Sequence, residues 1–468
     1  MVYLFPKTVI MDFGNIYFIG IGGIGMSSIA RYFKHIGKNV AGYDRTSTVL
    51  TRALEEEGMD IHYEDNVALV PDIFKNVSDT LVIYTPAIPS EHAELNYFRD
   101  NGFRIVKRSK ALGELSQGKY LMAVAGTHGK TTTSTMAAYF DNMAGSGSSA
   151  FLGGISRNFQ SNLVLGNEKN LIVEADEFDR SFLQLFPDAA VVTAVDADHL
   201  DIYGTYEEVK KSFAEFISQI KRGGVLVLNN RIDIDLADKN DIAVYRYSYD
   251  IPCDFYAKNI KPVEGGHSCF DIVCPDMVIE NCISGIPGWI NIENAVAAVA
   301  LIWKSGFDAD KLKDAIGSFS GVKRRFEFYI NTPEVVYMDD YAHHPEELKA
   351  AIKSLRKMFP GRKIKAIFQP HLYTRTRDFA KEFSESLSLA DEVVLLPIYP
   401  ARELPIDGVD SEMIRKNITS DARIIDKSQI PDLVRNEPVD VLVTFGAGDI
   451  DVYCGQINSI LKEKYGLE

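Results

Sequence analysis

The sequence has few cysteines, no long apolar run and no excess of positive charge. Its five cysteines are Cys253, Cys269, Cys274, Cys282 and Cys454. Four of them fall within about thirty residues, but only His267 stands beside them, so we expect buried thiols in a reducing compartment rather than a zinc site. No run of about 20 apolar residues occurs, which predicts no membrane span. Pro6, Lys7 and Asp12 interrupt the first apolar residues, so we expect no secretory signal and a cytoplasmic protein.

The shortage of positive charge excludes a general nucleic-acid binder. Lysine and arginine total 50 against 65 aspartate and glutamate residues, a net charge of −15, whereas phosphate backbones are bound by clustered cations. Small phosphorylated ligands need only a few local cations and stay possible. The length of 468 residues predicts about three domains. Strand and helix patterns alternate throughout, which predicts an α/β fold with units at 1–117, 118–321 and 322–468.

The clearest functional motif is the stretch YLMAVAGTHGKTTT at residues 120–133. Residues 120–125 predict a buried strand and residues 134–143 a helix, so a glycine loop lies between strand and helix. Such a loop binds phosphates through its backbone N–H groups and the helix N-terminus. The expected ATP-binding residues of this loop are Gly126, Thr127, His128, Gly129, Lys130, Thr131 and Thr132. Lys130 would reach the terminal phosphates and Thr131 would ligate Mg²⁺. Val124 replaces the first glycine of the usual pattern.

A second glycine loop lies near the start of the chain, between a predicted strand at 16–19 and a predicted helix at 26–36. Its sequence, GIGGIG at residues 20–25, has the G-x-G-x-x-G spacing. This geometry binds the diphosphate of NAD or of a nucleotide-sugar equally well. The residues expected to bind the ligand are Gly20, Gly22, Gly23, Ile24, Gly25, Asp44 and Thr85. Alternatively, Asp44 only caps the turn that follows it.

Further polar side chains follow buried strands in the middle unit. Glu174 ends one predicted strand, and Asp198 and His199 follow another. Carboxyl ends of parallel strands gather at one sheet edge. Thr131, Glu174 and His199 are therefore candidate ligands of a Mg²⁺ ion, or of Mn²⁺, although histidine is less usual for so hard a cation.

The third unit brings imidazole, phenol and guanidinium groups to its strand ends. They lie in DDYAHHP at residues 339–345 and QPHLYTRTR at residues 369–377. Arg375 suits a carboxylate or a phosphate. A zinc site at His343 and His344 is not favoured, because adjacent side chains point apart and no third ligand is evident. The basic run at 323–325 is either a solvated hinge or the source of a cation for phosphoryl transfer.

Together these motifs resemble the Mur ligases of bacterial peptidoglycan synthesis, along nearly the whole chain. The matching segments are GIGGIGMS at 20–27, AGTHGKTT at 125–132, EADE at 174–177, DHLD at 198–201, GVKRRFE at 321–327, DDYAHHP at 339–345, QPHLYTRTR at 369–377 and GAGDI at 446–450. The family's phosphate loop also lacks the first glycine. The resemblance implies a Rossmann-like UDP-binding domain, a central, mostly parallel P-loop ATPase-type domain and a C-terminal Rossmann-like amino-acid-binding domain.

The resemblance also implies an activity and roles for individual residues. The activity is an ATP-dependent ligase that joins L-alanine to the lactyl carboxylate of UDP-N-acetylmuramate through an acyl phosphate, giving ADP and phosphate. Lys130, Glu174, His199, Arg325, His343 and Arg375 would be catalytic. Asn291 and Asn294 would contact adenine. Tyr341, His343, His371 and Arg375 would form the amino-acid site.

Three other functions are compatible with the sequence. A tripeptide-adding recycling ligase would act on the same UDP-sugar, although GIGGIGM at 20–26 favours the alanine-adding branch. A nucleotide-sensing protein would bind without turnover, and a dehydrogenase would bind NAD.

Two positions depart from the family pattern. Ile290 stands where a histidine usually precedes the first asparagine, and Phe213 stands where other branches carry a carbamylated lysine, with Lys210 and Lys211 nearby.

Overall fold

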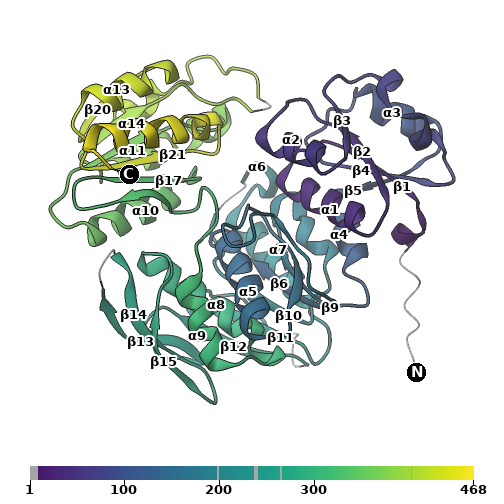
Figure 1. Cartoon of the computed structure of the whole chain (residues 1–468), viewed down its shortest axis with the longest axis horizontal. Coiled ribbons are helices and arrows are strands. Elements are labelled where there is room, and N and C mark those ends of the chain that lie inside the picture. Colours follow the sequence, from purple (N-terminus) through teal and green to yellow (C-terminus); the bar gives the residue numbers. More distant parts are fainter. Residues whose placement is uncertain (1–8, 198–199, 237–240, 264–265, 402, 468) are drawn as a thin grey trace. The chain divides into compact units, whose positions relative to one another are not determined.

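The chain folds as three β-sheets with helices between their strands (Figure 1). The computed structural model describes residues 9–197, 200–236, 241–263, 266–401 and 403–467. Two compact units can be separated. The first contains the residues up to 259 together with 270–282 and 292–320, and the second contains 260–269, 283–291 and the residues from 321 onward. Each unit is described by itself. The domain boundaries expected at 117/118 and 321/322 stay predictions.

The first sheet is parallel and has the strand order β3-β2-β1-β4-β5. Its strands are β1 (Asn15–Ile19), β2 (Asn39–Tyr43), β3 (Asp60–His62), β4 (Thr80–Tyr84) and β5 (Arg104–Lys107). Its helices are α1 (Ile24–His35), α2 (Val49–Glu56), α3 (Ala93–Asp100) and α4 (Arg108–Leu115), with short 3₁₀ turns at Val9–Asp12, Val67–Leu69 and Asp72–Lys75. Strand β1 is buried along its whole length, as expected for the centre of a parallel sheet.

The middle sheet is mixed and has the order β15-β14-β13-β12-β11-β10-β6-β9-β7-β8. The strands from β7 through β9, β6, β10, β11 and β12 to β13 pair in parallel, and β8 pairs antiparallel with β7. The strands are β6 (Tyr120–Ala125), β7 (Ser148–Phe151), β8 (Leu163–Val164), β9 (Asn167–Glu174), β10 (Ala189–Val192), β11 (Val225–Asn229), β12 (Ala243–Ser248), β13 (Phe255–Pro262), β14 (Ser268–Val273) and β15 (Val278–Ile283). The helices are α5 (Lys130–Ala144), α6 (Leu200–Tyr203), α7 (Tyr206–Ser218), α8 (Trp289–Ile302) and α9 (Ala309–Ser318), with 3₁₀ turns at Phe178–Gln184 and Trp303–Ser305.

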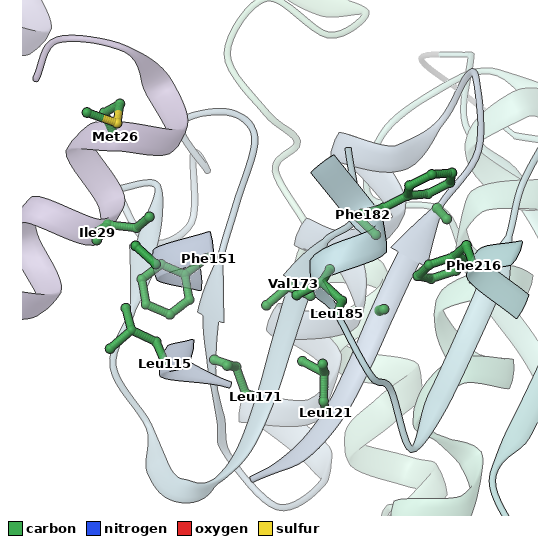
Figure 2. Close-up of a cluster of buried hydrophobic side chains, with 14 of the residues drawn as sticks. Met26, Ile29, Leu115, Leu121, Phe151, Leu171, Val173, Phe182, Leu185 and Phe216 are labelled. Atoms are coloured by element: carbon green, nitrogen blue, oxygen red, sulfur yellow. The ribbon is translucent and has the colours of Figure 1, made fainter. Parts of the chain in front are cut away.

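One hydrophobic core joins the first sheet's helices to the middle sheet. Met26 and Ile29 of α1 and Leu115 of α4 belong to the same buried cluster as Phe151 of β7 and Leu171 of β9 (Figure 2). Because a close-packed interior is barely compressible, this packing holds α1 and α4 firmly against the sheet that carries the central site.

The second unit contains the third sheet, with the order β16-β17-β21-β18-β19-β20. Strand β16 is antiparallel to β17, and the other pairs are parallel. The strands are β16 (Glu327–Asn331), β17 (Val336–Asp340), β18 (Ile364–Phe368), β19 (Glu392–Leu395), β20 (Asp421–Ile424) and β21 (Val441–Phe445). The helices are α10 (Pro345–Met358), α11 (Tyr373–Leu387), α12 (Glu412–Arg415), α13 (Ile430–Asn436) and α14 (Cys454–Tyr465), with 3₁₀ turns at Lys427–Gln429 and Asp449–Tyr453. Helix α10 begins at Pro345, with Glu346 and Glu347 in its first turn, where a proline fits and negative charges favour the helix dipole.

The five cysteines are free thiols, and Cys274, Cys282 and Cys454 are buried. Burial raises the pKa of Cys274 to about 12, which keeps this thiol protonated and unreactive. In the part of the chain that the structure describes, no helix is both long enough and apolar enough to cross a membrane.

Phe182 provides a test of the shared core. Its ring stacks on Phe216 at 4.9 Å and meets Phe213 edge-on at 5.2 Å. We expect Phe182→Ala to lower the free energy of unfolding by about 3–5 kcal/mol, because it removes a fully buried ring and leaves a cavity. Phe186 is 56% exposed, so Phe186→Ala serves as the matched control and should change the value by less than about 0.5 kcal/mol. Urea unfolding measures both, and equal effects of the two substitutions would contradict the assignment.

Candidate active site

The phosphate loop is built as the sequence predicts, with two glycines in backbone conformations that other residues rarely adopt. Gly126 has φ 137° and Gly129 has φ 80°. A Cβ at Gly126 would lie 2.8 Å from the backbone nitrogen of Ala194 and 2.9 Å from that of Thr193. The Thr193 hydroxyl donates to the carbonyl of His128, and the Thr127 N–H donates to the Ala194 carbonyl at 2.9 Å. The loop is therefore held against the end of β10.

Helix α5 starts directly at Lys130, four residues earlier than the sequence predicts. Its N-cap is Gly129, which has no side chain to use as a cap. The first N–H groups of the helix thus remain available to an anion, together with the positive end of the helix dipole.

The Lys130 ammonium lies among carboxylates. Its Nζ is 2.8 Å from Glu177 Oε2 and donates to the Gly126 carbonyl at 2.6 Å. Burial opposes the positive charge, but the carboxylates of Glu177, Asp176 and Glu174 outweigh it and raise the pKa of Lys130. Lys130 is therefore protonated at neutral pH and already points along the loop.

Thr131 and Glu174, which the sequence proposes as metal ligands, are in direct contact. The Thr131 hydroxyl donates to Glu174 Oε1 at 3.0 Å, and the Gly153 N–H donates to Oε2 at 3.0 Å. The contact follows from the pairing of β6 with β9, which sets Val124 opposite Glu174. A hydroxyl and a carboxylate oxygen side by side fit a hard divalent cation such as Mg²⁺. His199, the third proposed ligand, lies outside the described residues.

The two asparagines expected at the adenine have different surroundings. Asn294 accepts a hydrogen bond from the Thr133 hydroxyl at 3.2 Å, and a Cβ at Gly129 would lie 3.0 Å from Asn294 Oδ1. Asn294 is therefore next to the phosphate loop. Asn291 belongs to the second unit and donates to the Pro287 carbonyl at 2.6 Å. Their role in binding adenine stays a prediction.

The first glycine loop brings together the residues expected around the diphosphate. The Gly22 N–H donates to Asp44 Oδ2 at 2.8 Å, while Asp44 Oδ1 accepts from the Thr46 N–H at 3.2 Å. Asp44 thus caps its own turn and also contacts the loop, while its role in binding the ligand stays a prediction. Gly20 has φ 87°, and a Cβ there would lie 2.6 Å from Thr85 Cγ2.

In the second unit, the basic segment 323–325 lies against the DDYAHHP loop. Asp340 accepts from the Phe326 N–H at 3.0 Å and from the Ala342 N–H at 2.8 Å, and so ties the two segments together. Arg325 lies over the ring of Tyr341, 4.9 Å from its centroid. Arg324 is committed to the fold, because it pairs with the buried Asp339 at 3.1 Å and donates to the Gly446 carbonyl at 2.6 Å.

Two of the imidazoles proposed for the amino-acid site meet edge to face. The rings of His343 and His371 have centroids 6.0 Å apart, and His371 stacks on Tyr399 at 5.7 Å. Tyr341 meets His343 edge-on at 5.3 Å. Arg375 lies in the first turn of α11 and is half-buried. Tyr341, His343 and His371 therefore form one cluster.

Phe213 is a core residue, fully buried against Phe182. The neighbouring lysines lie elsewhere: Lys210 is 4.8 Å from the centroid of the Tyr206 ring, and Lys211 Nζ is 3.6 Å from Glu208. Neither lysine contacts Lys130, Thr131 or Glu174 in any described interaction.

Sequence reasoning missed Arg108 and Asp176, which are paired at 2.8 Å. Asp176 lies in the EADE segment, and Arg108 directly follows β5. The available signal was the position of Arg108 at a strand end, where polar residues of parallel sheets gather. Nothing in the sequence pointed to its partner 68 residues away.

Family models cover most of the chain. The Mur ligase family catalytic domain matches residues 15–120, the Mur ligase middle domain matches 124–302, and the domain described as the Mur ligase glutamate ligase domain matches 324–448.

Individual proteins match over nearly their whole length. The chain is 49% identical over 453 residues to the UDP-N-acetylmuramate–L-alanine ligase of Phocaeicola vulgatus, covering 96% of this chain and 98% of that protein. It is 48% identical over 448 residues to the ligase of the same name from Parabacteroides distasonis, covering 95% and 97%. Among solved structures, the UDP-N-acetylmuramate-alanine ligase of Thermotoga maritima aligns with a TM-score of 0.76 at 25% identity, covering 97% of this chain and 99% of the other. A murein peptide ligase from Psychrobacter arcticus shares the fold, with a TM-score of 0.67 at 22% identity over 97% and 98%.

Asp340 predicts a measurable pH dependence of stability. Burial raises its pKa to about 7, although the charge of Arg325 and the backbone N–H bonds partly oppose the shift. Between about pH 4 and pH 7 the folded chain keeps a proton that the unfolded chain releases, so this group destabilises the fold as the pH rises through that window. Asp340→Asn should remove that contribution, which amounts to at most about 1.4 kcal/mol per pH unit.

Urea unfolding of the variant and the parent at several pH values measures the difference. Asp432→Asn, at a side chain 75% exposed in the same unit, is the control and should leave the pH dependence unchanged. A parent–variant difference that stays constant from pH 5 to pH 8 would contradict the assignment.

Proposed function

Because the chain belongs to the Mur ligase family, we propose that it joins L-alanine to the lactyl carboxylate of UDP-N-acetylmuramate and converts ATP to ADP and phosphate. The observation that carries the proposal is the 49% identity to an alanine-adding ligase over 96% of this chain. The product is a precursor of peptidoglycan.

The reaction needs activation, because a carboxylate is a poor electrophile and amide formation in water is uphill. A lactyl carboxylate oxygen attacks the γ-phosphorus of ATP, the bond to the β–γ bridging oxygen breaks, and ADP leaves. The resulting acyl phosphate is attacked at its carbonyl carbon by the neutral amine of L-alanine. The C–O bond to phosphate then breaks, and the amine proton passes to a base. This balances to one amide, one ADP and one phosphate.

Lys130 and the phosphate loop supply the electrostatic part of the first step. Phosphoryl transfer depends mainly on positioning and on neutralising the charge of the transferring group. The ammonium of Lys130 lies 2.6 Å from the Gly126 carbonyl, beside the loop where the β- and γ-phosphates would bind. Thr131 and Glu174 would hold a Mg²⁺ ion, with His199 as a further ligand. Such an ion would neutralise phosphate charge.

The second unit would supply the amino-acid site. The clustered rings of Tyr341, His343 and His371 support this assignment, with Arg375 as the partner of a carboxylate or a phosphate. One of the two imidazoles would accept the amine proton. Arg325, next to Tyr341, would add positive charge toward the transferring group.

The diphosphate of the UDP-sugar would bind the loop at residues 20–25. The loop has the glycines and the helix N-terminus that this group needs, and Asp44 and Thr85 border it. The G-x-G-x-x-G spacing is thereby read as a substrate site and not as an NAD site.

A phosphate-release assay with a panel of amino acids tests the function. We expect release that requires ATP, UDP-N-acetylmuramate and an amino acid together, with L-alanine the best substrate. Release driven best by a tripeptide would instead identify a recycling ligase. Nucleotide binding without any release would identify a binding protein, and either result would overturn the proposal.

Lys130→Ala tests the first step. Removing the cation should lower ADP release at least about a hundredfold while binding of UDP-N-acetylmuramate, followed by calorimetry, persists. Because the change leaves the buried Glu177 without this partner, which is costly, the double variant Lys130→Ala/Glu177→Gln is measured in parallel. Lys211→Ala, at a side chain 75% exposed, is the control. Undiminished ADP release in both Lys130 variants would exclude the assigned role.

A further inference from the structure

Two ion pairs connect the start of α4 to the segment that follows β9. Arg108 Nη2 is 2.8 Å from Asp176 Oδ2, and Lys107 Nζ is 3.0 Å from Asp179 Oδ2. Both pairs are within the first unit. The reaction described above assigns no role to any of these four residues. The two pairs differ, however, in what else their members contact.

Arg108 also packs against the first glycine loop. A Cβ placed on Gly25 would lie 3.2 Å from Arg108 Cδ and 3.3 Å from Cζ, with Nη1 nearer still. The guanidinium therefore occupies the space beside the first turn of α1 that a side chain at residue 25 would fill. Its two terminal nitrogens have different neighbours: Nη1 is next to Gly25, and Nη2 is bonded to Asp176. A planar guanidinium suits such a double contact, whereas an ammonium acts as a single point charge.

In the chain, Asp176 lies between Glu174 and Glu177, two residues whose carboxylates contact the phosphate loop. Glu174 accepts from Thr131 at 3.0 Å, and Glu177 pairs with Lys130 at 2.8 Å. The charge of Asp176 itself acts on Lys130. The segment 174–177 thus has its two ends attached to the phosphate loop, while its middle is attached to Arg108.

We propose that Arg108 is a positioning residue that couples the two substrate sites. An anionic group bound at residues 20–25 contacts Nη1 and fixes the guanidinium. The fixed guanidinium then orders Asp176, together with Glu174 and Glu177, for the Mg²⁺–nucleotide. The identity of the two ligands rests on the function proposed above. The coupling strengthens nucleotide binding when the UDP-sugar is present, so ATP is cleaved mainly when an acceptor carboxylate is in place.

The surrounding structure suits this role. Met26 and Ile29 of α1, Leu115 of α4 and Leu171 of β9 share one buried cluster (Figure 2). This packing fixes the backbone on both sides of the Arg108–Asp176 pair. Ordering of the guanidinium therefore orders the Asp176 side chain and does not shift the backbone. Coupling between the sites is then reciprocal, with each ligand tightening the other by the same factor.

Calorimetric titration of a Mg²⁺-bound, non-hydrolysable ATP analogue tests the proposal. The dissociation constant is measured on the full chain with and without saturating UDP-N-acetylmuramate. We expect the sugar nucleotide to tighten analogue binding about fivefold or more in the parent protein. In Asp176→Asn and in Arg108→Lys this ratio should fall to within about twofold of unity.

Each variant changes one feature of the Arg108–Asp176 contact. Asp176→Asn keeps Oδ1, which accepts from the Phe178 N–H at 3.1 Å. It replaces Oδ2, the acceptor of the Arg108 bond, with an NH2 donor, so it removes the charge and that hydrogen bond together. Arg108→Lys keeps the charge and removes the second nitrogen. Gly25→Ala keeps both charges and displaces the guanidinium, so its ratio should also fall. Asp179→Asn removes the neighbouring ion pair between the same two segments, and this matched control should keep the ratio of the parent. Thermal unfolding confirms that each variant is folded.

The outcomes separate this proposal from the function itself. A parent protein that ligates L-alanine but shows no tightening would overturn the coupling alone. Retention of the full ratio in Asp176→Asn and Arg108→Lys would do the same, as would an equal loss in Asp179→Asn. Failure of the parent to bind UDP-N-acetylmuramate would instead overturn the proposed function.

Discussion

The central site depends on the placement of one buried carboxylate, that of Glu177, beside Lys130. Glu177 is 1% exposed, and a charge so deeply buried is stable only when it is paired. The pair draws the segment after β9 onto the phosphate loop, and the same segment delivers Glu174 to Thr131. The pair and the Thr131–Glu174 contact thus bring the helix start, the loop glycines and the proposed metal site together. Such preorganisation means that little rearrangement is needed when charge develops in the reaction.

In the second unit, two carboxylates hold a segment whose backbone has positive φ angles. Arg324 has φ 62° and Phe326 has φ 49°, a conformation that costs free energy for residues other than glycine. The carboxylates of Asp339 and Asp340 hold this segment in place through Arg324 and through the Phe326 N–H. Both adjacent arginines lie over the Tyr341 ring, Arg324 at 5.2 Å and Arg325 at 4.9 Å from its centroid, and Arg324 in addition holds the loop through Asp339.

The parts of the site that the sequence predicted are the local ones. A strand, a glycine loop and a helix are adjacent in the chain, so residues 120–133 and residues 16–36 could be read directly. The contact between Thr131 and Glu174 was also within reach, because parallel strands bring their carboxyl ends to one edge. The Arg108–Asp176 pair was not, because it depends on how α4 packs against the 3₁₀ turn Phe178–Gln184, where Gly113 lies against Gln184. The different contacts of Arg324 and Arg325 could not be predicted either, because adjacent identical residues differ only in the direction of their side chains.

The bare Cα of Gly25 has an evolutionary consequence. The volume beside it is filled by the side chain of Arg108, so a side chain at position 25 would displace the guanidinium from its present place. Loss of the arginine would relax the demand for glycine, and gain of a larger residue at position 25 would first displace the arginine from Asp176. A substitution at either of the two positions, 83 residues apart in the chain, would therefore change the surroundings of the other.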